Sequence, residues 1–279
     1  MLLYVSFRCN QAFSAKVEAA LRGIATISGF NIEFLIDHIA WPTGAWKDVF
    51  RILTANGIRR VGSVHFVEGL LPDWRHPDKE WLAAALDFDF SLVGVNPVAD
   101  YNPRLPAPKK GYIPFDKPIL IDEIPSGPGV RVDENYIISK KFYDFLGGNA
   151  TLRSGGNVVF KGKPLTTWLR FEPLTWVDFL DKDSFSPEMP CGCCGAPYIP
   201  TSGILIGKHD EPYDGPVTFD QNGFDHFGAT HTVIVSLDQA AAMTNQFRGK
   251  EYILEPIYKH GSATARQVRE VLDYAQPKG

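Results

Sequence analysis

The run of prolines between Asn96 and Pro128 constrains this 279-residue chain most, since eight of those 33 residues are proline. Proline has no backbone N–H and a fixed φ, so we expect neither a helix nor a central strand there beyond the short apolar run 119–121. We therefore predict three parts: an α/β module over 1–96, a proline-rich connection over 97–128 and an α+β module over 129–279. The parts can still pack as one domain.

The first module alternates apolar runs with amphipathic stretches, which predicts a βαβ-like arrangement. Strands are expected over 2–7, 31–36, 60–67 and 90–95. Helices are expected over 12–23, 45–56 and 79–86, where apolar residues recur at helical spacing. Gly23 and Gly57 stand where helix C-caps are expected, because glycine readily adopts the left-handed conformation that ends a helix.

The second module contains a weak internal repeat and is predicted to be mixed, largely antiparallel β structure with short helices. Each copy contains a strand, a serine, a short helix and a later strand that ends at Glu-Pro. The serines are Ser139 and Ser236, and each hydroxyl is expected to accept a hydrogen bond from the first helical turn. Because strand, serine and helix often follow one another, two unrelated segments remain the alternative to a true repeat. A last helix is expected over 263–274.

The composition predicts a chain that folds throughout. With 44% hydrophobic and 22% charged residues, 279 residues can bury a core without a metal or a disulfide. The start has no basic segment followed by a long apolar run, and no window holds the roughly 18 apolar residues of a membrane span. Together with only four cysteines, this predicts a cytoplasmic protein without a membrane partner.

Negative charge is concentrated in one part of the chain. Residues 177–228 carry nine Asp and Glu against two Lys, a balance of −7, whereas the rest of the chain carries +3. A local acidic face argues against nucleic acid as a partner and fits the docking of a basic protein. The alternative is an ordinary solvated surface loop.

Three of the four cysteines lie in the stretch PCGCCGAP, residues 190–197. Cys191 and Cys194 form a C-x-x-C-G knuckle, which can present two thiolates to a tetrahedral zinc ion. A structural zinc site needs four ligands, and Cys9 is the only other cysteine, so no second knuckle exists. A zinc site at Cys191 and Cys194 and a tight loop with idle thiols are therefore both open, and no other cofactor is expected.

The sequence argues against two of three catalytic roles for these cysteines. The zinc deaminase signature needs an upstream H-x-E, and the nearest candidate, residues 65–68, has one residue too many. A redox thiolate is activated at a helix N-terminus, and no helix is expected directly after the cysteines, because residues 195–197 continue as a loop. A nucleophilic cysteine with a histidine oriented by a carboxylate stays open, because such partners meet only in space.

The order of motifs in the second half resembles the double-CXXCG proteins. The resemblance covers residues 130–260 and rests on five stretches: 157–163, 168–172, 190–195, 224–227 and 233–236. That family includes immunity proteins of bacterial swarming-inhibition and other polymorphic toxin systems. Its members carry an earlier CxxCG pair that this chain lacks, which leaves the metal uncertain. The resemblance implies a non-catalytic binding protein that acts in competition between bacteria.

The leading hypothesis is an immunity protein that neutralises the C-terminal toxin domain of a secreted or Rhs-like effector by covering its active site. No catalytic residue is assigned. Aromatic anchors ringed by acids suit an interface with a basic toxin. The predicted toxin-binding residues are Trp176, Asp178, Phe179, Asp181, Asp183, Phe185, Asp210, Glu211, Tyr213 and Asp214. The rival hypothesis is a metal- or thiol-dependent enzyme that uses Cys191, Cys193 or Cys194.

Overall fold

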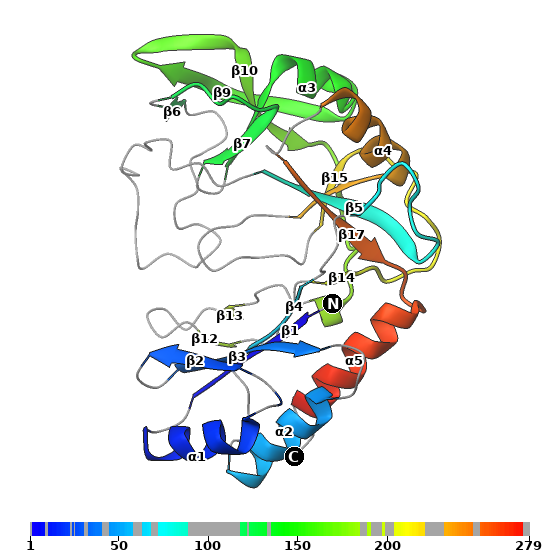
Figure 1. Cartoon of the computed structure of the whole chain (residues 1–279). Helices are drawn as coiled ribbons and strands as arrows, with labels where there is room; N and C mark the ends of the chain where they lie inside the picture. Colours follow the sequence, from blue (N-terminus) through cyan, green and yellow to red (C-terminus); the bar gives the residue numbers. More distant parts are fainter. Residues whose placement is uncertain are drawn as a thin grey trace.

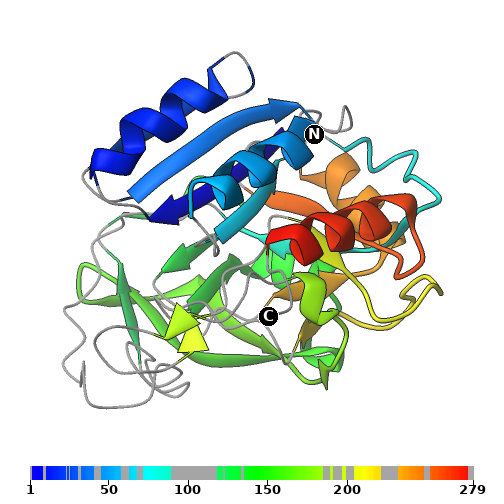
Figure 2. The same ribbon diagram turned by 90° about the horizontal axis from the view of Figure 1, so that it is seen from below.

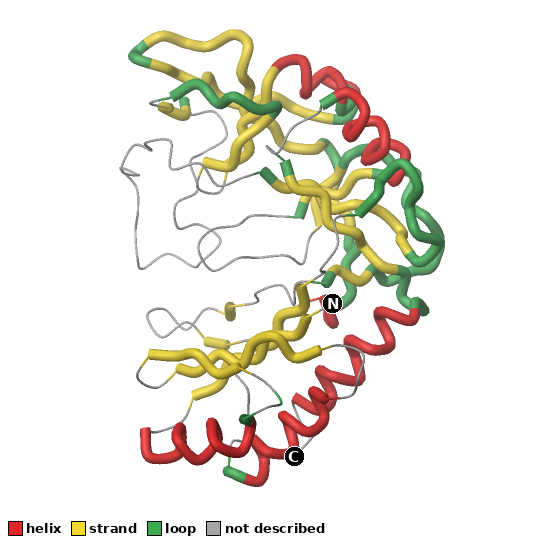
Figure 3. Tube along the Cα trace, in the orientation of Figure 1, coloured by secondary structure: helices red, strands yellow, loops and turns green. Residues whose placement is uncertain are grey.

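The protein has an α+β fold, as predicted, with short helices on curled, largely antiparallel sheets (Figure 1, Figure 3). The computed structural model describes residues 2–8, 11–22, 24, 26–30, 33–40, 45–57, 63–67, 72–88, 118–121, 123–132, 135–184, 189–190, 197–198, 204–220, 232–247 and 252–275. No helix in these ranges is long and apolar enough to cross a membrane.

The N-terminal part is a four-stranded antiparallel sheet with two helices over one face (Figure 1, Figure 2). Its elements in chain order are β1 (Leu2–Arg8), α1 (Gln11–Leu21), β2 (Thr26–Phe30), β3 (Glu33–Ala40), α2 (Ala45–Ala55) and β4 (Ser63–Val67). The strand order is β2-β3-β1-β4, and each neighbouring pair is antiparallel. Strands β1 and β2 therefore run in the same direction with β3 between them.

The helices of this part form because their apolar residues recur at helical spacing. On α2, Trp46, Val49, Phe50 and Leu53 are buried, which gives the helix one apolar stripe toward the sheet. The helix ends before Gly57, whose φ of 81° is left-handed. The helices predicted over 12–23 and 45–56 are confirmed, as is the glycine stop at Gly57.

The helix predicted over 79–86 is wrong. Residues Trp81–Asp87 form strand β5, at the centre of a six-stranded sheet of order β11-β15-β16-β5-β17-β14. The three alanines 83–85 favour a helix by propensity, but β16 and β17 hydrogen-bond to either side of this segment. The consecutive residues Ala84 and Ala85 belong to different core clusters, so β5 is buried on both faces, which suits a continuous apolar run.

The remaining strands form the six-stranded sheet around β5, a five-stranded sheet of order β6-β9-β10-β8-β7 and a short pair. In the first are β11 (Trp176–Val177), β14 (Leu205–Ile206), β15 (Thr218–Asp220), β16 (Val233–Val235) and β17 (Ile253–Tyr258). In the second are β6 (Ile119–Ile121), β7 (Gly129–Val132), β8 (Asn135–Ser139), β9 (Leu152–Phe160) and β10 (Lys163–Pro173), and β12 (Met189–Pro190) pairs with β13 (Pro197–Tyr198). The strand expected over 119–121 is thus confirmed.

Both serines of the repeat cap helices as predicted. Ser139 Oγ accepts from Phe142 N at 3.3 Å and begins α3 (Lys140–Phe145). Ser236 Oγ accepts from Gln239 N at 3.2 Å and begins α4 (Leu237–Gln246), and Gln239 Oε1 accepts from Ser236 N to complete a capping box. The two helices lie side by side, since the rings of Phe142 and Phe247 meet at 4.8 Å.

The repeat differs in its second half. Strand β9 and the 3-10 helix η2 (Gly148–Ala150) separate α3 from β10, whereas β17 is the next element that the structure describes after α4. Strand β10 ends at Pro173, but β17 continues past Pro256 to Tyr258.

The last helix, α5 (Ala263–Ala275), confirms the prediction for 263–274 and packs against α2. Glu80 Oε1, just before β5, accepts from Ala263 N at 2.9 Å, and Ser262 Oγ accepts from Ala265 N at 3.0 Å. These contacts satisfy N–H groups that a helix start leaves without partners. Helix α5 therefore starts at the six-stranded sheet and runs along the N-terminal part.

Candidate functional site

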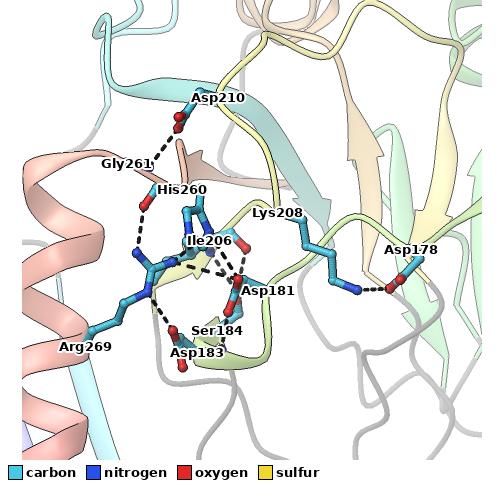
Figure 4. A network of polar contacts seen from close by, with 10 residues as sticks. All are labelled: Asp178, Asp181, Asp183, Ser184, Ile206, Lys208, Asp210, His260, Gly261 and Arg269. Carbon is cyan, nitrogen blue, oxygen red and sulfur yellow. Dashed lines mark hydrogen bonds and ion pairs between the residues drawn. The ribbon is translucent and has the colours of Figure 1, made fainter.

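Three segments that are distant in sequence lie together at the predicted site (Figure 4). The first runs from β11 to the 3-10 helix η3 (Lys182–Ser184), the second follows β14, and the third joins β17 to α5. Backbone hydrogen bonds align the first two: Asp181 N donates to Ile206 O at 2.7 Å and Lys208 N donates to Phe179 O at 2.9 Å. Gly207 N donates to Tyr258 O at 2.8 Å and attaches the third.

Trp176 is the exposed aromatic residue of this region. Its accessibility is 41%, and its ring packs edge-on against buried Phe219 with centroids 5.0 Å apart. Leu174, two positions earlier, is 52% exposed. Because Phe219 holds the indole in place, Trp176 presents apolar surface that is already ordered before any partner binds.

Phe179 was expected at the surface, and this is wrong. It is only 8% exposed and packs edge-on against Tyr213, with centroids 5.3 Å apart. The cause is the buried carboxylate of Asp220, whose Oδ2 accepts from Phe179 N at 2.8 Å and Leu180 N at 2.7 Å. These bonds fix the backbone where the ring enters the core. Asp220, counted in the acidic segment, is itself fully buried and adds nothing to a surface charge.

Tyr213 is half-buried and lies between this core and the surface. Its hydroxyl donates to Pro216 O, and burial, with a smaller effect of the neighbouring Asp214 charge, raises the pKa of its phenol. The phenol therefore stays protonated and serves as a hydrogen-bond donor.

Three of the predicted acids form ion pairs within the protein (Figure 4). Asp178 pairs with Lys208. Asp181 Oδ2 lies 3.2 Å from His260 Nδ1 and 3.8 Å from Arg269 Nη2. Asp183 Oδ2 accepts from Arg269 Nε at 2.7 Å. The negative charge of these three side chains is therefore largely compensated inside the molecule.

The other three acids lie on the exposed loop after β14. Asp210 Oδ1 accepts from Gly261 N at 2.7 Å, which attaches the loop to the start of α5. Glu211 and Asp214 are exposed, and neither forms an ion pair with any residue that the structure describes. Among the predicted site acids, the carboxylates without an ion pair in the described part of the chain thus lie in residues 210–214.

Arg269 is a structural clamp at the base of the site. Besides Asp183, its Nη1 donates to His260 O at 2.8 Å and its Nη2 lies 2.9 Å from His260 Nδ1. All three guanidinium nitrogens are therefore engaged within the protein, and the planar fork suits this geometry. The clamp ties α5 to η3 and to the end of β17.

Sequence reasoning missed Lys208, His260 and Arg269. The acidic partners of His260 and Arg269 lie far away in the chain. Arg269, for example, is 86 residues from Asp183. No local spacing signals such a contact. Lys208 was counted only as a charge within the acidic segment.

The predicted site residues Phe185, Cys191 and Cys194, and also Cys193, lie outside the described residues. Within the described ranges, no group of three or more His, Cys, Asp or Glu is placed to hold a metal ion. The zinc site stays a prediction.

No family model, no curated protein and no solved structure matches this chain. The resemblance to the double-CXXCG proteins therefore stays a prediction from the order of the motifs.

Proposed function

We propose that this protein is an immunity protein that binds the toxin domain of a polymorphic toxin and covers its active site. The observation that carries the proposal is the exposed, pre-ordered indole of Trp176. Tryptophan is among the residues that most often dominate binding energy at interfaces, and a ring already held in place loses little freedom on binding. Leu174 extends the apolar surface beside it.

The charged residues of this region indicate the chemistry of the partner. The Phe179–Tyr213 contact and the Asp178–Lys208 ion pair attach the 208–214 loop to the segment that follows Trp176. The loop carries the exposed acids Asp210, Glu211 and Asp214. Exposed acids favour a basic partner, such as a nuclease domain with a cationic cleft, because complementary charge accelerates association. The carboxylates would occupy the place of the substrate phosphates.

The proposal places the protein in the bacterial cytoplasm, with the C-terminal toxin domain of a secreted or Rhs-like effector as its partner. Its test is affinity capture of the tagged full-length chain from its native cells, followed by mass spectrometry. We expect a stoichiometric toxin polypeptide or its C-terminal fragment, and co-expression should protect cells from that fragment. Recovery of a folded, abundant protein without such a partner contradicts the proposal.

A second candidate is a thiol-dependent enzyme, and one observation favours it. His260 lies 3.2 Å from the Asp181 carboxylate, and a histidine and a carboxylate are two of the residue types that a thiol-dependent site uses. Asp181 precedes the cysteine stretch by ten positions. Substitution of Cys191, Cys193 and Cys194 by serine separates the two candidates. An immunity protein still protects toxin-expressing cells, whereas a thiol-dependent enzyme loses its activity.

A further inference from the structure

His260 Nδ1 lies between two groups that it cannot serve at the same time. Arg269 Nη2 is 2.9 Å away, and Asp181 Oδ2 is 3.2 Å away on another segment. A guanidinium only donates hydrogen bonds and a carboxylate only accepts them. Contact with Arg269 therefore requires Nδ1 without a proton, and contact with Asp181 requires Nδ1–H.

The neutral ring has one proton and the charged ring has two. In the neutral ring that accepts from Arg269, the proton is on Nε2. In the imidazolium both nitrogens carry a proton, so Nε2 is a donor in both states and only the contact of Nδ1 changes. Histidine is the side chain that commonly changes charge between about pH 5 and pH 8.

We propose that His260 is a pH-sensitive switch that exchanges Arg269 for Asp181 as the partner of its Nδ1. When His260 gains a proton, Nδ1 can no longer accept, the imidazolium repels the guanidinium, and Asp181 becomes its acceptor. Arg269 keeps two other partners, Asp183 and the carbonyl of His260, so α5 stays attached while Nδ1 is released.

Among the described residues, several segments beside this ring carry charged or titratable groups. They are Asp181 and Asp183 at η3, His209 and Asp210 after β14, Lys259 before the ring, and Arg266 and Arg269 on α5. Asp181 and Arg269 are the two whose charged atoms lie close to Nδ1, so they decide its partner.

The exchange acts on η3 through Asp181. Its Oδ1 accepts from Asp183 N at 3.0 Å and its backbone carbonyl accepts from Ser184 N at 2.9 Å, so the same residue opens η3. A shift of Asp181 toward His260 therefore changes the first turn of the segment that continues into PCGCCGAP. The switch does not depend on the identity of the toxin.

The test is nuclear magnetic resonance of the full chain with ¹⁵N-labelled histidine, in which the two ring nitrogens report the tautomer directly. The chain has seven histidines, and His260→Gln identifies the signal by its loss. In the neutral ring we expect the Nε2–H tautomer, and in the charged ring a proton on both nitrogens. Arg269→Met keeps the apolar stem but removes the donor, so the neutral ring should change to Nδ1–H and donate to Asp181.

Arg269→Lys is the matched control, since an ammonium can still donate to Nδ1 and should preserve the Nε2–H tautomer. Far-UV circular dichroism verifies that each variant is folded. An Nδ1–H tautomer in the neutral ring of the wild type would overturn the switch, and so would an Nε2–H tautomer that persists in folded Arg269→Met.

Discussion

Arg269 Nε donates to Asp183 Oδ2 at 2.7 Å, which joins α5 to η3 across 86 residues of chain. The next residue, Glu270, accepts from Lys47 Nζ of α2 at 2.6 Å. Two consecutive residues of one helix therefore bind the C-terminal sheet region and the N-terminal part. Helix α5 is the element that ties these two parts together.

The Arg269 contact should matter more to stability than the Lys47 contact. Arg269→Met leaves Asp183 and the His260 carbonyl without their donor in a partly buried site, and we expect a loss of about 1–2 kcal/mol in the free energy of unfolding. Lys47→Met removes a half-exposed ion pair and should cost less than about 0.5 kcal/mol. Urea unfolding followed by circular dichroism measures both. Equal losses would mean that the Arg269 cluster is no stronger than a surface ion pair.

Asp220 should be among the most sensitive polar positions. Asp220→Ala leaves the N–H groups of Phe179 and Leu180 without their acceptor in the core, and we expect a loss of about 2–4 kcal/mol. Asp214→Ala, an exposed acid six residues earlier, should change stability by less than about 0.5 kcal/mol. Thermal and urea unfolding of the pair test this. A small effect at Asp220 contradicts its structural role.

Trp176 should dominate binding to the captured toxin domain. Trp176→Ala removes the ordered indole, and we expect a loss of about 2 kcal/mol in binding, roughly 30-fold in Kd. Ile253→Ala is the control, because Ile253 is equally exposed at 40% but lies on β17. Calorimetric titration gives both constants. If the two variants bind alike, Trp176 is not the anchor.

The loop acids should act on the association rate. Charge reversal of Glu211 and Asp214 to lysine leaves every described ion pair intact, and we expect roughly a tenfold slower association at low salt, with a weaker salt dependence. Reversal of Asp273 and Glu123, which are exposed elsewhere, has the same change in net charge and should have little effect. Surface plasmon resonance at several salt concentrations compares them. Identical rates for the two double variants would remove residues 210–214 from the interface.

The loop before β5 should show an unusual titration. Hydrogen bonds from His76 and then Arg75 lower the pKa of Asp73 from 3.8 to about 2. A lowered pKa favours the ionised carboxylate in the folded loop, so this local structure is fully favoured above pH 3.8 and lost as the pH falls through about 2. Carbon-detected nuclear magnetic resonance of the Asp73 carboxyl group over a range of pH measures this pKa. His76→Ala should raise the pKa of Asp73, and an unchanged value would exclude His76 as the main cause.

The elements that sequence reasoning placed correctly depend on contacts within a few residues. Ser139 and Ser236 cap helices because an N-cap bond spans three residues, and α2 and α5 show their apolar stripes in the sequence. The strand over 119–121 stands out as the one apolar run among the prolines. In each case the cause and its effect lie in the same short segment.

The elements that were wrong or missed depend on partners far along the chain. The alanines of β5 favour a helix locally, but they become a strand because β16 and β17 pair with them from about 150 and about 170 residues later. Phe179 enters the core because Asp220 holds its backbone. Ion pairs with Arg269 and His260 compensate much of the negative charge of Asp181 and Asp183.

The sequence by itself therefore determined the α+β class, the helix caps and the concentration of acids in one segment, because these depend on local hydrogen bonds and on composition. Only the tertiary structure decided which acids face a partner, since an ion pair or a buried ring depends on segments that the fold brings together. Asp181 and Glu211 look alike in the sequence, yet one is held beside His260 and Arg269 and the other stands exposed.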